Sequence, residues 1–295
     1  MTQLRQKMLE ELQRRNYSPK TIYYYLKTVK DFANYFGKSP DQLGPDELRR
    51  YQVYLLKERK LGVRSVATRV AALRFFFIRT LKKEGFREEI PYPKYTRPLP
   101  TVLSKEEVAR LINAAGNLTH RTLLMILYGT GMRRAEVKQL KVHHIDSSRM
   151  MIHVECGKGG YSRDIPLSTV LLETLREYWR YKKPKDYLFP GRGKKNQPII
   201  GKTIWNACLQ AARFAGITKH VMPHTLRHSF ATHMLEDGTD LRTIQILLGH
   251  RDLETTARYL HLSQSHLRAV VNPLDSLQIK SVFEIEDYYR RKVQK

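Results

Sequence analysis

Cysteine is scarce in this 295-residue chain, which contains only Cys156 and Cys208. The two lie far apart and form no C-x-x-C pair, so the sequence predicts neither a disulfide framework nor a metal site built from thiolates. Low cysteine usage without a disulfide framework is typical of a reducing compartment. We therefore expect a cytoplasmic protein.

Long apolar runs are also missing. The longest, residues 123–128, is far shorter than the roughly 20 residues that a membrane-spanning helix needs. The N-terminal stretch MTQLRQKMLEELQRR is rich in charged and polar residues and lacks the apolar centre of a secretory signal. The sequence predicts no membrane partner and no export.

Acidic residues are few relative to basic ones. The chain has 28 Asp and Glu against 53 Lys and Arg, a net charge of +25, and its isoelectric point is near 10.1. The first 100 residues carry a net +12 and the other 195 a net +13. This charge favours a polyanionic partner such as nucleic acid, bound in a salt-dependent manner. The alternative is a basic surface with no role beyond solvation.

The first 88 residues are predicted to form four helices. In the second, Ser18 can cap the N-terminus, Pro19 suits the first helical position, and apolar residues follow at helical spacing. The fourth is expected to begin near Ser65 and to end at Gly85. The tyrosines at 23–25 suit base stacking, but helical spacing favours one core position and two surface positions.

A proline-rich basic connector separates two predicted domains. Pro91, Pro93, Pro98 and Pro100 rule out a continuous helix. Ser104 with Glu107 three residues later then forms a capping box, the signal of a new helix. We predict a helical domain over residues 1–90, a linker over 91–103, a second domain over 104–277 and a tail over 278–295.

The second domain is predicted to be mainly helical with a small β-sheet. Met150, Ile152 and Val154 alternate, a glycine-rich turn follows, and residues 161–166 run back, which is typical of a β-hairpin with Lys158 at its tip. Helices are expected near residues 169–181, 202–215, 225–236, 241–248 and 253–262.

Five segments, in order and at matching spacing, resemble tyrosine recombinases of the phage integrase family, both Xer-like and carried by mobile elements. They are TRPLPTVLSKEEV, YGTGMRRAEV, CGKGGYSRDIPL, HTLRHSFATHML and LLGHRDLETTARY. One motif alone is a weak signal, whereas five together are specific. The resemblance covers residues 1–265. It implies a mainly α fold, with a four-helix core-binding domain and an α+β catalytic domain that carries the small β-sheet.

The resemblance implies six catalytic residues: Arg133, Lys158, His224, Arg227, His250 and Tyr259. Arg133, rather than its neighbour Arg134, matches the family's first arginine. Glu136 would share its helical face and brace its guanidinium. Arg227 follows His224 in a His-x-x-Arg pair. Two forked guanidiniums suit the oxygens of a phosphorus atom that becomes five-coordinate.

Lys158 resembles the family's mobile lysine, which protonates the departing 5′ oxygen, and its flanking glycines allow close approach to DNA. Tyr259 lies nine residues after His250, the spacing of the family's nucleophile. A phenol has a pKa near 10, so it needs a base or electrostatic help. His224 is a candidate base and His250 a candidate phosphate ligand, but spacing leaves that division open.

The histidines His224, His228 and His233 also suggest a metal site. However, Thr225 stands where the H-E-x-x-H pattern needs its glutamate. We predict no metal, no ATP and no other cofactor, and we give His228 and His233 structural roles.

The implied function is site-specific recombination. Tyr259 would attack a DNA phosphodiester and leave a 3′-phosphotyrosine and a free 5′ hydroxyl. Strands would exchange through a Holliday junction to integrate, excise or resolve DNA. The expected partners are double-stranded DNA at specific sites and three further copies of the chain in a homotetramer. The sequence does not show whether accessory proteins are needed. The tail SVFEIEDYYRRKVQK would pack on a neighbouring protomer or stay a solvated basic helix.

Two other functions compete with recombination. A type IB topoisomerase shares the chemistry, but chain length and the linker favour the recombinase. A DNA-binding regulator without activity shares the fold, but it would not need the full catalytic set. The segment NPLDSL after the nucleophile favours a recombinase carried by a mobile element.

Overall fold

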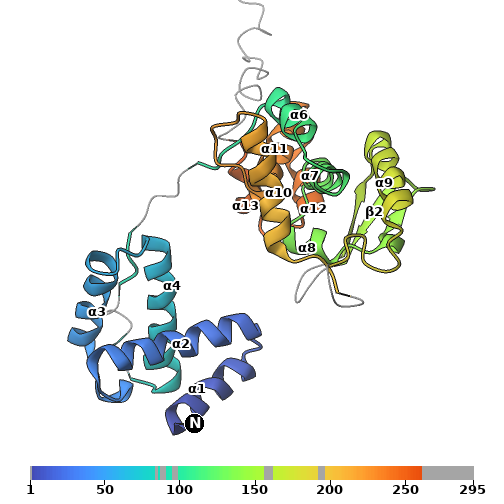
Figure 1. Cartoon of the computed structure of the whole chain (residues 1–295). Coiled ribbons are helices and arrows are strands. Elements are labelled where there is room, and N and C mark those ends of the chain that lie inside the picture. The colour runs from blue at the N-terminus through green and yellow to red at the C-terminus, as the bar shows by residue number, and fades with distance from the viewer. Residues whose placement is uncertain are drawn as a thin grey trace, which may run out of the picture. The chain divides into compact units, whose positions relative to one another are not determined.

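The computed structural model describes residues 2–83, 86, 91–94, 99–155, 162–191 and 197–260. The chain forms two compact units, Met1–Pro98 and Leu99–Lys295 (Figure 1). The predicted domain borders at residues 90, 103 and 277 stay predictions. In the part of the chain that is described, no helix has both the length and the apolar character needed to cross a membrane.

The N-terminal unit contains the four predicted helices, which confirms that part of the fold. They are α1 (Gln3–Arg14), α2 (Pro19–Phe36), α3 (Pro45–Lys57) and α4 (Val63–Arg74), with a short 3-10 turn, η1 (Pro40–Gln42), before α3. At the start of α2, the Ser18 hydroxyl accepts a hydrogen bond from the backbone N–H of Thr21 at 3.2 Å. Gly37 ends the helix in the left-handed conformation.

The end of the fourth helix differs from the prediction. Helix α4 begins at Val63, two residues early, and continues into a π-helical segment, η2 (Phe75–Thr80). A π turn adds a residue per turn and so changes which side chains face inward. Three consecutive phenylalanines, at positions 75–77, are all buried there. Gly85, the predicted stop, lies outside the described residues.

The three consecutive tyrosines of α2 lie as expected. Tyr23 and Tyr24 are exposed. Tyr25 packs its ring against Tyr17 and Phe75, with ring centroids 5.8 and 5.9 Å apart. The prediction of one core and two surface positions is confirmed.

The C-terminal unit is built around a buried helix, α7 (Leu118–Thr130), whose residues from Thr122 to Leu127 are all buried. Its packing partners are α6 (Lys105–Asn113), α8 (Arg134–Gln139), α9 (Thr169–Lys182), α10 (Gly201–Phe214) and α11 (Pro223–Glu236). The predicted capping box opens α6: Ser104 Oγ accepts from the Glu107 N–H at 3.2 Å, and Glu107 Oε2 accepts from the Ser104 N–H at 2.8 Å.

The small sheet is antiparallel, in the order β1 (Ile145–Asp146), β2 (Met151–Val154), β3 (Arg163–Pro166), after a short 3-10 turn, η3 (Val142–His144). It lies with α9 at one side of the unit (Figure 1). The predicted hairpin of β2 and β3 is confirmed, whereas β1 was not predicted. Strand β2 begins at Met151 because Met150 has a left-handed φ of 54°. The hairpin tip with Lys158 lies outside the described residues.

Two further helices complete the described part of this unit, α12 (Leu241–Leu248) and α13 (Leu253–Ala257). The expected helix over 253–262 is therefore too long. Tyr259 lies in a turn after α13, where its backbone N–H donates to the carbonyl of Thr256 at 3.0 Å. The candidate nucleophile thus lies in a turn, so the direction of its side chain is not set by the periodicity of α13.

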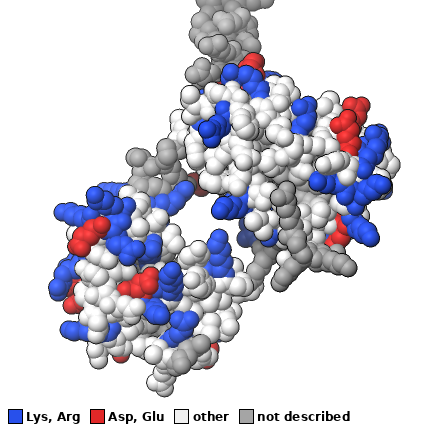
Figure 2. Space-filling model, viewed as in Figure 1, with Lys and Arg blue, Asp and Glu red and all other residues white. Residues whose placement is uncertain are grey.

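Basic side chains are scattered over the visible surface of each unit (Figure 2). On the face shown in Figure 2, Lys and Arg are more widespread than Asp and Glu on both units. This agrees with the near-equal division of the excess positive charge along the chain. Each unit therefore offers positive charge to a polyanion.

Candidate active site

The C-terminal end of α12 holds three arginines. The carbonyl of Leu247 accepts from Arg163 Nε at 2.6 Å. The carbonyl of Leu248 accepts from Arg227 Nη2 at 2.7 Å, and that of Gly249 from Arg133 Nη2 at 3.0 Å. The last carbonyls of a helix lack intrahelical partners and carry partial negative charge, so they attract guanidinium groups. Arginines from α11, from β3 and from the residue before α8 are therefore gathered at one point.

Two glycines in the left-handed conformation make this arrangement possible. Gly131, with φ of 60°, ends α7 and presents its carbonyl to Arg227 Nη1 at 2.6 Å. A Cβ at Gly131 would overlap the ring of Phe230, and one at Gly249, φ 61°, would lie 2.8 Å from Arg163 Nη1. A larger residue would therefore displace Phe230 or Leu248 at the first position and Arg163 at the second.

Glu136 joins two of the three arginines. Its Oε1 accepts from Arg133 Nη1 at 2.9 Å and its Oε2 from Arg163 Nη2 at 2.8 Å. Burial raises the pKa of Glu136, but the hydrogen bond and charge of Arg163 and the hydrogen bonds from Arg133 outweigh it, so the pKa lies below its usual value. The predicted brace on Arg133 is confirmed. However, Arg133 is the N-cap residue of α8 rather than a helical residue.

Arg227 and His250 are hydrogen-bonded to each other. Arg227 is 3% exposed, and burial lowers its pKa to about 10, so it stays charged at neutral pH. His250 Nε2 lies 2.9 Å from Arg227 Nη2. Because a guanidinium only donates, Nε2 accepts, and the ring proton sits on Nδ1, 2.8 Å from Thr256 Oγ1. Burial and the nearby arginines lower the pKa of His250 to about 3.

Tyr259 lies beside this cluster and is 1% exposed. Its hydroxyl is 3.0 Å from His228 Nδ1. Its ring is parallel to that of His250, with centroids 6.5 Å apart. Burial raises the pKa of Tyr259, while the charges of Arg227, Arg258 and Arg133 act in the opposite direction. These arginines are close enough to stabilise negative charge on the phenol oxygen.

His224 lies one turn before His228 on α11 and is exposed. Its pKa is lowered by desolvation and by Arg227, Arg134 and Arg133. Among the described residues, no hydrogen bond joins it to Tyr259. The structure therefore brings Arg133, Arg227, His250 and Tyr259 together, with His224 near the arginines. Lys158 lies outside the described residues.

Buried guanidiniums, neutral histidines and a phenol together can bind a phosphoryl group and attack it. Models of two protein families agree with this chemistry. Residues 101–266 match the phage integrase family, and residues 4–85 match its N-terminal SAM-like domain. The chain belongs to the phage integrase family.

Individual relatives give the same result. A protein of Sinorhizobium fredii named as an integrase/recombinase is 46% identical, over 94% of this chain and 90% of its own length. The tyrosine recombinase XerA of Pyrococcus furiosus is 38% identical, over 93% and 96%. The structure of a lambda integrase tetramer bound to a Holliday junction shares the fold, with a TM-score of 0.70, 18% identity and coverage of 93% and 79%. This phage integrase is a tyrosine-type site-specific recombinase that cleaves and rejoins DNA.

Three residues that contact this cluster were not assigned to it from the sequence. Arg163 and Thr256 were not singled out, and His228 was given a structural role. A signal for Arg163 exists: it lies two residues before Ile165 on the inward face of β3, where a charged side chain requires a buried partner. The contact of His228 has no comparable signal. The structural role of His233 is confirmed, because its Nδ1 lies 2.9 Å from the Tyr128 hydroxyl.

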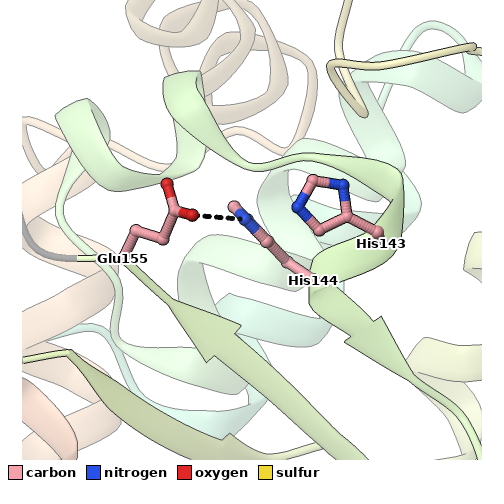
Figure 3. A group of neighbouring side chains, drawn as sticks. All are labelled: His143, His144 and Glu155. Carbon is pink, nitrogen blue, oxygen red and sulfur yellow. Dashed lines mark ion pairs between the residues drawn. The ribbon is translucent and has the colours of Figure 1, made fainter.

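A group of potential metal ligands lies elsewhere in this unit (Figure 3). Ligand atoms of His143, His144 and Glu155 lie within 4.8 Å of one another. His144 Nδ1 accepts from the backbone N–H of Lys141 at 3.2 Å, so its ring proton sits on Nε2 and faces Glu155 Oε1 at 3.4 Å. A metal at Nε2 would need that nitrogen unprotonated, at the expense of the Lys141 contact. This geometry favours a histidine–carboxylate pair.

Proposed function

We propose that Tyr259 is the nucleophile of this recombinase and that Arg133 and Arg227 bind the scissile phosphate. The observation that carries the proposal is the convergence of both guanidiniums and the buried phenol at the C-terminal end of α12. Backbone carbonyls and Glu136 hold the arginines in place before substrate arrives. Groups positioned in advance stabilise developing charge without a reorganisation cost.

In the proposed reaction, Tyr259 Oη attacks phosphorus and the bond to the 5′ oxygen breaks. The product is a 3′-phosphotyrosine and a free 5′ hydroxyl, and attack by a 5′ hydroxyl of the partner duplex reverses the step. The phosphotyrosine link conserves the energy of the broken phosphodiester bond, so no ATP is consumed. Lys158 is assigned to protonate the leaving 5′ oxygen, on the sequence pattern alone.

The two histidines of the catalytic set receive different roles. His224 is exposed beside the arginines, which suits a contact with the phosphate. His250 accepts from Arg227 and contacts Thr256, which suits orientation of Arg227. His250 thus acts on the phosphate through Arg227.

The assembly proposed for this chain is a homotetramer on two specific DNA sites, with strands exchanged through a Holliday junction. The lambda integrase tetramer on a Holliday junction, which shares the fold, supports this proposal. The relative named as an integrase/recombinase favours integration or excision of a mobile element over resolution of chromosome dimers. A packing role for residues 278–295 stays a prediction.

A nicked duplex tests the nucleophile. Cleavage next to the nick releases a short 5′-hydroxyl fragment by diffusion and traps the protein on DNA, in EDTA and without ATP. The trapped species should survive SDS and yield a tyrosine peptide spanning ETTARYLHL. Tyr259→Phe keeps the ring and should bind DNA without forming an adduct. An undiminished adduct in Tyr259→Phe would refute the assignment.

A further inference from the structure

Two histidines one turn apart on α11 have different surroundings. His224 is exposed, and its ring centroid lies 6.4 Å from that of His228. His228 is less exposed, and its Nδ1 lies 3.0 Å from the hydroxyl of Tyr259. The helix therefore directs one histidine toward solvent and the other toward the phenol.

His250 is the other histidine beside Tyr259, but both of its ring nitrogens are engaged. Nε2 accepts from Arg227, and Nδ1 carries the ring proton toward Thr256. A neutral imidazole has one lone pair, and here Arg227 occupies it. His250 is therefore not free to take a proton from the phenol.

We propose that His228 takes the hydroxyl proton of Tyr259 during strand cleavage and returns it during rejoining. The proposal rests on the proposed function, since it requires Tyr259 to be the nucleophile. In cleavage, the Oη–H bond breaks as the Oη–P bond forms, and the proton moves to His228 Nδ1. The electron pair of the broken P–O bond leaves with the 5′ oxygen, which is protonated by Lys158. In rejoining, the 5′ hydroxyl returns its proton to Lys158 as its oxygen bonds to phosphorus, and the phenol oxygen leaves phosphorus and recovers its proton from Nδ1.

The charges around His228 agree with this role. Burial, and then the charges of His224, Arg258 and Arg227, lower the pKa of His228 to about 4. The ring is thus neutral at neutral pH and has a lone pair for the phenol proton. A bound phosphodiester brings negative charge that offsets the arginines and raises the pKa of a nearby histidine. His228 therefore becomes a stronger base when the substrate is in place.

The first test uses the full chain with His228→Asn. The asparagine side chain can place an oxygen near the position of Nδ1 and accept a hydrogen bond, but it does not take a proton at neutral pH. We expect adduct formation on the nicked duplex to slow by about 100-fold or more, with DNA binding unchanged in a gel-shift assay. A wild-type rate in His228→Asn would overturn the proposal.

The second test separates proton transfer from packing. A ring-fluorinated tyrosine at position 259 has a more acidic phenol and depends less on a base. It should raise the rate of His228→Asn by about 10-fold or more. The matched variant His224→Asn, on the same helix, should gain far less. Absence of this selective gain would overturn the proton-acceptor role.

The outcome for Tyr259→Phe distinguishes the two proposals. An adduct in Tyr259→Phe refutes the proposed function, and the role of His228 with it. No adduct in Tyr259→Phe, together with a wild-type rate in His228→Asn, refutes only the role of His228.

Discussion

The two units of the recombinase differ in where their charged side chains lie. Among the described residues, the core of the N-terminal unit buries no ionised side chain and is rich in aromatic residues such as Phe32, Tyr51 and Phe77. The C-terminal unit buries Arg163 and Arg227, and all 11 histidines of the chain follow residue 100. Positive charge on the first unit is therefore a surface property, whereas in the second it is part of the interior. Buried charge requires fixed partners, and here backbone carbonyls and Glu136 supply them around the candidate site.

The largest effect is expected from breaking the buried pair of Arg163 and Glu136. Arg163→Met keeps similar volume but leaves Glu136 and the Leu247 carbonyl without this guanidinium. The free energy of unfolding of the C-terminal unit should fall by about 3 kcal/mol or more, measured by urea denaturation. Lys105→Met is the control, because the pair of Lys105 and Asp237 is exposed and should contribute less than about 1 kcal/mol. Equal losses in both variants would contradict the comparison.

A catalytic effect of similar size is expected at Arg133. Arg133→Ala should reduce the cleavage rate by about 100-fold, equivalent to about 2.7 kcal/mol of transition-state stabilisation, with little change in DNA binding. Arg134→Ala should change the rate far less, because Arg134 is exposed at the start of α8. Single-turnover cleavage measures both. Similar losses at the two positions would mean that the motif is read one residue out of register.

An effect in the same range is expected from the glycine that positions the carbonyl for Arg227. Gly131→Ala adds both the strain of a left-handed alanine and an overlap with Phe230, which should cost roughly 2 to 4 kcal/mol. Gly216→Ala has the same strain, with φ of 64°, but its Cβ would meet no atom within 4 Å. This variant should lose only about 1 kcal/mol of its free energy of unfolding. Thermal unfolding of both variants isolates the overlap, and indistinguishable midpoints would show that Phe230 moves aside freely.

The smallest effect concerns mild acid. The folded-state pKa values of His228 and His250, about 4 and about 3, lie below the usual histidine value. Between about pH 6.5 and 5 the unfolded chain binds protons that these folded-state side chains do not, so stability is complete above this window and falls within it. By about pH 6 the C-terminal unit should lose roughly a few degrees of its unfolding midpoint, and His228→Asn should lose less. The N-terminal unit, without histidine, should hardly change; an equal loss there would contradict the comparison.

Much of the fold could be predicted from local sequence, because its signals act within a few residues. Caps such as Ser18 and Ser104 form bonds three residues away, and the alternation of Ile152 and Val154 defines a strand face without reference to the rest of the chain. Where longer contacts intervene, the prediction failed. Strand β1 is two residues long and depends on pairing with β2, and the π-helical segment depends on packing of three phenylalanines.

For the site, the sequence by itself determined which side chains are present and which family they resemble, because the motifs are contiguous. Only the tertiary structure decided how they meet. Arg133, Arg163 and Arg227 come from three separate segments and bind neighbouring carbonyls of a fourth, and no spacing along the chain encodes that convergence. The sequence offered His224 of α11 as the partner of the phenol and gave His228 a structural role. The turn after α13 places the Tyr259 hydroxyl at His228. The direction of the tyrosine side chain depends on where α13 ends and on what the ring packs against, and neither is encoded locally.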